Sequence, residues 1–316
     1  MTGEVTRRRG YEETRLRDTQ ARPRLLVSLY PHAVTVPIAA RAVLTGVIVA
    51  AVGTLPWAAL VSLNTRHQAA LPWAVPVMAA YLWGYWRYFA RGAGWPQSTA
   101  DTRRIDARAN PLPPDAWGSA LLAGMLGLVG VLLLQGVLSR LITLPQQRDL
   151  DVSQYPVLTV MMWITMSAVV AGVVEETAFR GYLQRPIERR HGPVVAILLT
   201  GILFGFVHFS HPEVGVVLLP FYVSVAAVYG ALAYFTDSTL PGMLLHAGGN
   251  LFSIFDLFAR GRSEWQLTAE VRPLIWDTGP DAAFWGNVAA LVIVAALTVA
   301  AYGVLARTMP KTQRAG

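Results

Sequence analysis

Residues 155–184 read YPVLTVMMWITMSAVVAGVVEETAFRGYLQ, and no charged side chain interrupts them from Tyr155 to Val174. A helix needs about 20 mostly apolar residues to cross the hydrocarbon core of a bilayer, so this run predicts a transmembrane helix. Two adjacent carboxylates, Glu175 and Glu176, follow directly. Charged groups are costly inside a membrane and mark functional sites there, so these two acids are the first candidates for chemistry.

The composition extends this prediction to the whole chain. Of 316 residues, 54% are hydrophobic and only 14% are charged, and the mean hydropathy is +0.42, far more apolar than an average soluble domain. We therefore predict an all-α, polytopic membrane helix bundle of about eight transmembrane helices, with the catalytic core in helices 4 to 7. The predicted runs are 42–63, 71–90, 117–138, 155–174, 193–210, 214–235, 239–258 and 283–306.

Several classes of function are excluded by composition. The chain has no cysteine, which excludes disulfides, thiolate catalysis and cysteine-based metal sites. The net charge of +7 comes from basic residues that lie in blocks between the apolar runs. Such blocks are typical of membrane topology, so we expect membrane lipid and not nucleic acid as a partner.

The arginines also predict the orientation. Seven arginines lie before residue 25, whereas the loop after the first run has only Arg66. Because positive loops stay on the cytoplasmic side, we expect both termini to be cytoplasmic in an inner (plasma) membrane protein. The segments are then a cytosolic Arg-rich tail and interfacial segment (1–41), three helices with a cytosolic loop at 91–116 (42–150), a core (151–258), and an outer loop, last helix and cytosolic tail (259–316).

Glu176 has a partner on its own helix. Residues four apart share a helix face, so Glu176 and Arg180 are predicted to form a structural ion pair that lowers the cost of their burial. Glu175 points in another direction and stays available for chemistry.

Two further apolar runs carry polar residues. FGFVHF contains Phe204 and His208, and LLHAGGN contains His246 and Asn250. Together with Glu175 they form the set needed to activate a water molecule and to stabilise an oxyanion.

A helical hairpin predicts that Glu175 and His208 meet. The sequence His191-Gly192 followed by Pro193 is a helix-stopping signal. Glu175 lies sixteen residues before His191, and His208 lies sixteen residues after Gly192. Antiparallel helices around this hinge would bring the two side chains to one level, provided that the helix carrying His208 is short or tilted or that the chain is kinked at Pro220.

Other interpretations use the same residues. A buried histidine is often an interhelical hydrogen-bond partner, and a chain of Glu and His residues also suits the proton relay of a proton-coupled transporter. Asn250 distinguishes the two functions, because an oxyanion site needs such a donor and a proton relay does not.

The three sequence motifs, in this order, resemble those of a known family. EETAFR, FGFVH and HAGGN are similar to the EExxxR, FxxxH and HxxxN motifs of the CPBP intramembrane proteases, which include CAAX prenyl endopeptidases and bacterial Abi proteins linked to bacteriocin immunity. The resemblance covers residues 155 to about 258. It implies that Glu176, Arg180 and Phe204 support the site.

The resemblance also implies an activity and roles. The protein would be an endopeptidase acting on a membrane-associated peptide or protein, with Glu175 as the base that activates water and His208 positioning that water. His246 and Asn250 would hold the oxyanion. A non-catalytic immunity or scaffold protein is the remaining alternative, although all the motif positions are intact.

The metal dependence is predicted from the chain itself. Glu175, His208 and His246 are the side-chain types of a catalytic zinc site, and the family is often described as metalloproteases. No HExxH is present, however, and asparagine is a poor zinc ligand but a good oxyanion donor. We expect no cofactor, with zinc bound by Glu175, His208 and His246 as the alternative.

Overall fold

The computed structural model describes residues 37–143, 152, 154–208, 212–260 and 273–309. Contacts divide the chain into two units, Met1–Pro37 and Ile38–Gly316, and all the helices named below belong to the second unit. The Arg-rich tail and most of the interfacial segment predicted at 1–41 therefore lie outside the described residues.

The described residues are helical and contain no strand, which confirms the all-α prediction. The helices are α2 (Ile38–His67), α3 (Ala74–Phe89), the 3-10 helix η1 (Gln97–Thr99), α4 (Ala100–Ala107), α5 (Pro114–Leu141), α6 (Val157–Glu175), the π-helix η2 (Glu176–Leu183), α7 (Gln184–His191), α8 (Pro193–Val207), α9 (Pro212–Thr236), α10 (Leu240–Arg260), α11 (Ile275–Thr278) and α12 (Ala282–Thr308).

Five helical stretches among the described residues are long and apolar enough to cross a membrane, so the protein is a multi-pass membrane protein. They are α2, α5, the stretch Val157–His191, Val217–Thr236 within α9, and α12. All eight predicted runs are helices, but the number of eight spans is not established. The α8 helix has 15 residues and is only about 22 Å long, shorter than a hydrocarbon core of about 30 Å. The predicted short helix before His208 is thus confirmed.

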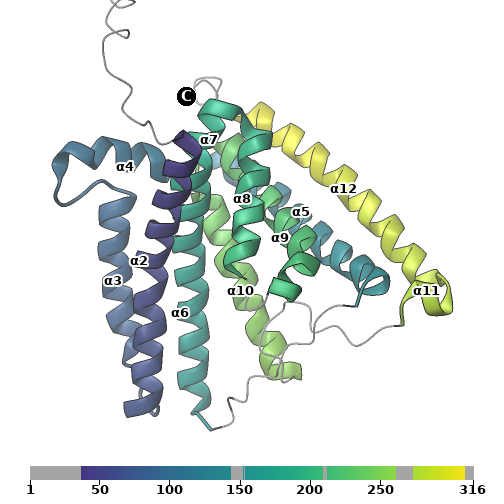
Figure 1. Ribbon diagram of the computed structural model, residues 1–316, viewed down its shortest axis with the longest axis horizontal. Coiled ribbons are helices and arrows are strands. Elements are labelled where there is room, and N and C mark those ends of the chain that lie inside the picture. Colours follow the sequence, from purple (N-terminus) through teal and green to yellow (C-terminus); the bar gives the residue numbers. More distant parts are fainter. Residues whose placement is uncertain (1–36, 144–151, 153, 209–211, 261–272, 310–316) are drawn as a thin grey trace, which may run out of the picture. The chain divides into compact units, whose positions relative to one another are not determined.

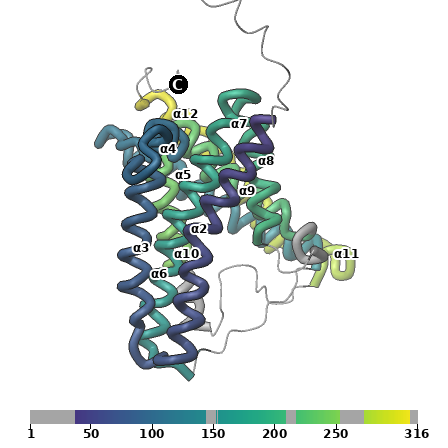
Figure 2. Tube along the Cα trace, turned by 60° about the vertical axis from the view of Figure 1, so that its left-hand side comes forward, coloured from purple at the N-terminus to yellow at the C-terminus, as the bar shows by residue number. Residues whose placement is uncertain are grey.

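The helices pack in two groups that are joined by η2 and α10. The α2, α3 and α6 helices lie side by side (Figures 1 and 2), and α10 packs against α6. On the other side α8 packs along α9, and α12 covers α5. The buried core runs through both groups and is rich in alanine, leucine and aromatic side chains.

The segment that carries both acids is unusual. From α6 the chain continues through the eight-residue π-helix η2 into α7, and the Gln184 N–H is bonded to the carbonyl of Phe179, five residues earlier. Pro186 lies just beyond and has no N–H with which to continue an α-helical pattern. Runs of π-helix are rare and often mark functional sites. The predicted hinge is confirmed, since α7 ends at His191 and α8 starts at Pro193.

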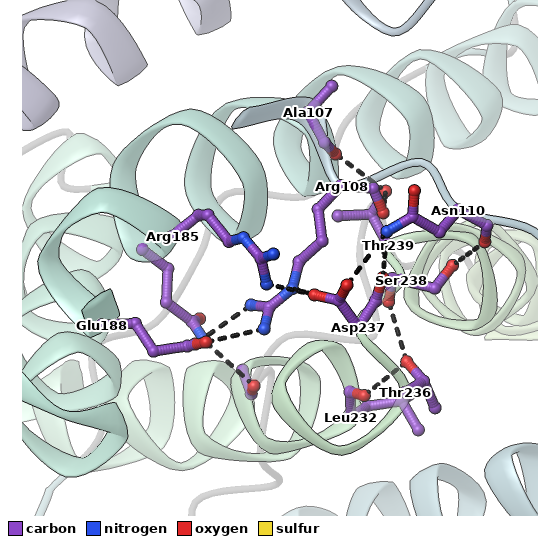
Figure 3. Close-up of polar contacts among 12 residues, drawn as sticks. Ala107, Arg108, Asn110, Arg185, Glu188, Leu232, Thr236, Asp237, Ser238 and Thr239 are labelled. Carbon is purple, nitrogen blue, oxygen red and sulfur yellow. Dashed lines mark hydrogen bonds and ion pairs between the residues drawn. The ribbon is translucent and has the colours of Figure 1, made fainter. Parts of the chain in front are cut away.

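A buried ion network joins three connections of the chain (Figure 3). The Arg108 guanidinium donates two hydrogen bonds to Glu188 of α7, at 2.6 and 3.0 Å, and one to Asp237 at 2.9 Å. Arg185 also pairs with Asp237, and the Asn110 amide donates to the same residue. Two arginines are thus matched by two carboxylates, as buried charges require.

This network fixes the start of α10. The Thr239 N–H donates to the Arg108 carbonyl at 2.9 Å, and the Ser238 hydroxyl donates to the Asn110 carbonyl at 2.6 Å. The α9–α10 turn is therefore attached to the α4–α5 connection. Since α10 begins at Leu240, His246 lies in its second turn. The contacts that fix the start of the helix therefore also fix the position of His246.

The network predicts a difference between buried and exposed ion pairs. Glu188→Gln should lower the free energy of unfolding by about 3 kcal/mol, because the buried Arg108 loses a charged partner. Asp101→Asn is the matched control, since the Asp101–Arg104 pair is exposed and such pairs contribute little. Thermal unfolding of both variants in the same detergent measures this difference. Equal stability of the two variants would contradict the role of the network.

Candidate active site

The three predicted motifs converge in the structure. Glu175 is the last residue of α6, His208 follows the last residue of α8, and His246 lies on α10. The Glu175 Oε2 atom is 3.9 Å from His208 Nε2 and 3.7 Å from His246 Nε2. Two imidazoles from different helices therefore face the same carboxylate oxygen.

Close contact between α6 and α10 makes this convergence possible. A Cβ atom at Gly172 would lie 2.8 Å from the Met243 carbonyl oxygen, and one at Gly242 would lie 2.8 Å from Glu176 Oε2. Gly172 lets the backbones of α6 and α10 approach, as small residues do in membrane proteins, whereas Gly242 leaves room for the Glu176 side chain against α10. His246 follows one turn after Gly242 and is thereby brought over the two acids.

Glu176 lies at the centre of the site and is fully buried with Arg180. Glu176 Oε1 is 3.2 Å from Arg180 Nη1, which confirms the predicted pair. The same oxygen is 2.9 Å from His246 Nδ1, a contact that the sequence did not predict. The Arg180 guanidinium lies over the Phe204 ring at 4.8 Å and over the Tyr229 ring at 5.2 Å, and such aromatic faces attract a cation.

His208 is oriented by its own helix. Its Nδ1 is 2.7 Å from the Phe204 carbonyl oxygen, and since a carbonyl only accepts, Nδ1 carries the hydrogen. In the neutral ring Nε2 is then an acceptor facing Glu175. The Phe204 ring, in edge contact with Phe179 at 5.1 Å, packs against the imidazole at 4.3 Å.

His246 is oriented by an acid instead. Its Nδ1 hydrogen bond to Glu176 directs Nε2 toward Glu175. The separations of 3.7 and 3.9 Å are too long for direct hydrogen bonds, but an oxygen atom beside them can lie about 2.8 Å from each group. The arrangement suits the binding of one water molecule.

Asn250 lies one turn after His246 on α10, half-buried. Residues four apart share a helix face, so Asn250 is on the same side of α10 as the imidazole. The structure therefore brings Glu175, His208 and His246 into one site, and Asn250 lies one turn further along α10.

The site also has two tyrosines that no sequence motif indicates. The Tyr222 ring stacks on His208, with centroids 5.1 Å apart, and the Tyr229 ring stacks on His246 at 5.2 Å. Both come from α9, which carries no motif residue. The only sequence feature that links them is their spacing of seven residues, which places both on one face of the helix.

The donor atoms of this site lie slightly farther apart than two ligands of one zinc ion. Zinc bonds to nitrogen and oxygen are about 2.0–2.2 Å long, so two ligand atoms on a tetrahedral ion are about 3.3–3.6 Å apart. The two separations from Glu175 Oε2 are larger. Within the described parts of the chain, no group of three or more metal-binding side chains has the geometry to hold an ion.

The buried centre predicts that Glu176→Gln destabilises the protein. Arg180 would lose its carboxylate partner in a fully buried position, which costs about 3–5 kcal/mol when one partner of a buried pair is removed. Expression level and thermal unfolding in detergent measure the effect. A Glu176→Gln protein as stable as the parent would show that the pair contributes little.

The comparisons with known proteins concern the same part of the chain. Residues 157–252 match the family model described as type II CAAX prenyl endopeptidase Rce1-like. No curated protein and no solved structure matches the chain. The matched segment begins with α6, ends within α10 and covers less than half of the chain. It contains all three motifs, so the similarity of residues 157–252 to the Rce1-like type II CAAX prenyl endopeptidases is consistent with the CPBP family.

Proposed function

We propose that this protein is an intramembrane endopeptidase that hydrolyses a peptide bond of a membrane-associated peptide or protein, with a glutamate as its base. The observation that carries this proposal is that His208 Nε2 and His246 Nε2 both face Glu175 Oε2. The Rce1-like match of residues 157–252 supports the same class of reaction.

In the proposed reaction Glu175 and His208 act on water. A water molecule hydrogen-bonded to Glu175 Oε2 and His208 Nε2 attacks the carbonyl carbon of the scissile bond, and its proton passes to Glu175. The C–N bond then breaks, and Glu175 returns this proton to the leaving amine. His208 is suited to orient the water because its Nδ1 hydrogen is already bonded to the Phe204 carbonyl.

His246 and Asn250 are the proposed oxyanion donors. His246 Nε2–H and the Asn250 amide would donate to the oxygen of the tetrahedral intermediate, and donors fixed before the reaction act most strongly on such a charge. His246 keeps its Nδ1 hydrogen bond to Glu176 meanwhile. The Glu176 carboxylate offsets the positive charge of the ring when both nitrogens carry hydrogens.

The geometry favours this function over the two alternatives. A proton relay needs groups in sequence across the membrane, whereas Glu175, His208 and His246 converge on one point. A scaffold protein needs no such convergence. The ends of α7 and α2 that meet near η2 carry Arg185, Arg189 and Arg41, so the site is proposed to open toward the cytoplasmic side of an inner membrane, with both termini cytoplasmic.

The test of the proposed function compares the parent protein with Glu175→Gln. Each is reconstituted in proteoliposomes with a detergent extract of bacterial membrane proteins, and new peptide termini are identified by mass spectrometry. We expect termini that form with the parent and are absent with Glu175→Gln, which keeps the shape but removes the base. The same termini with both proteins would contradict the proposal.

The bond cut fastest in that experiment then defines a probe. A fluorescence-quenched peptide that spans this bond, called the reporter peptide below, gives kcat and KM for each variant. Glu175→Gln should unfold at the temperature of the parent, so that a loss of cleavage reports chemistry and not folding.

The proposed site needs no metal ion. After exhaustive chelation, purified protein should cleave the reporter peptide within about twofold of its initial rate, because the carboxylate and the two imidazoles supply the base and the donors. Elemental analysis of the same sample is the companion measurement. Activity that disappears on chelation and returns only with zinc, at about one ion per chain, would instead make Glu175, His208 and His246 metal ligands.

A further inference from the structure

The α9 helix contacts both imidazoles although it carries none of the motif residues. The Tyr222 and His208 rings stack with centroids 5.1 Å apart and planes 29° from parallel. The Tyr229 and His246 rings stack at 5.2 Å and 14°. Both tyrosines are almost completely buried, and their spacing of seven residues, two helical turns, places them on one face.

We propose that Tyr222 and Tyr229 are positioning residues, which hold the two imidazole planes so that both Nε2 atoms point at Glu175. This inference rests on the proposed function. It assigns to α9 the task of aligning two histidines from the flanking helices α8 and α10.

The hydrogen bonds alone do not fix the rings. Each imidazole is held in its plane at Nδ1, His208 by the Phe204 carbonyl and His246 by Glu176. The last torsion of a histidine side chain is broad, so a ring held at one nitrogen can still tilt and swing Nε2 away from Glu175. A stacked ring opposes this tilt across the whole face of the imidazole.

Tyr229 has a second contact that ties it to the buried centre. The Arg180 guanidinium lies 5.2 Å from the centroid of its ring, and Arg180 pairs with Glu176. Glu176 in turn accepts the hydrogen bond from His246. Tyr229 therefore contacts both the histidine and the arginine that share one carboxylate oxygen, and loss of its ring removes one contact from each.

In this proposal the aromatic face of the tyrosine, and not its hydroxyl, holds the imidazole. Variants with and without an aromatic ring therefore test it. Tyr229→Leu removes the aromatic face, and it should lower kcat for the reporter peptide about 10- to 100-fold with KM within about threefold, because a displacement of about 1 Å costs up to about 100-fold in rate. Tyr229→Phe keeps the face and should retain kcat within about threefold. The corresponding pair at Tyr222 should behave in the same way through His208.

Two controls separate positioning from general damage. Tyr302 on α12 is also buried, packs on Phe235 and donates to the Val228 carbonyl, so Tyr302→Leu should reduce thermal stability while kcat stays within about twofold. In a His246→Ala background, Tyr229→Leu should change kcat less than twofold, since its effect passes through that imidazole. Tyr229→Met is a second variant without a ring, for use if the leucine variant does not purify as folded protein.

The outcomes are distinguishable. The inference is overturned if Tyr229→Leu leaves kcat unchanged or raises only KM. It is also overturned if Tyr229→Leu lowers kcat equally with and without His246, or if Tyr229→Phe has a kcat as low as that of Tyr229→Leu. Glu175→Gln in the same assay tests the proposed function separately. Retained cleavage by Glu175→Gln removes the proposed function, whereas lost cleavage together with a normal Tyr229→Leu kcat removes only the positioning role.

Discussion

The contact between the Glu176 carboxylate and its two cationic or hydrogen-donating neighbours is the constraint on which the site depends. One oxygen of a fully buried acid lies 3.2 Å from Arg180 and 2.9 Å from His246. An isolated charge in such a place would be very unfavourable, so the acid requires partners. Because one partner comes from η2 and the other from α10, satisfying this charge also fixes the relative position of two helices.

Other contacts in the core support the same arrangement of helices. Gly172 lets α6 and α10 approach closely, and Gly242 leaves room for the Glu176 side chain. The Arg108 network attaches the start of α10 to the α4–α5 connection and to α7. Two tyrosines of α9 stack on the imidazoles of His208 and His246. Glu175 is adjacent to Glu176 along the chain and is thus presented to both Nε2 atoms. A structural acid and a proposed catalytic acid have different tasks because their neighbours differ.

Much of this arrangement could be predicted from sequence because the signals are local. Apolar runs predict the helices, the spacing of four predicts the Glu176–Arg180 pair, and Gly192 with Pro193 predicts the hinge that brings His208 back to Glu175. The hydrogen bond from His246 to Glu176 joins residues 70 positions apart and depends on how closely α6 and α10 approach, which no local pattern indicates. The π-helix likewise changes the helical register in a way that periodicity does not show. Tyr222 and Tyr229 look like ordinary membrane-helix aromatics until α8 and α10 are placed beside them.

The central claim is that water is activated between Glu175 and His208 while the oxyanion is held by His246 and Asn250. Its most direct measurement is an experimental structure of the protein with a peptidyl trifluoromethyl ketone, whose hydrate resembles the tetrahedral intermediate. We expect one hydrate oxygen within hydrogen-bonding distance of Glu175 Oε2 and His208 Nε2, and the other within that distance of His246 Nε2 and the Asn250 amide. A hydrate held by a metal ion, or bound away from Glu175, would contradict the account.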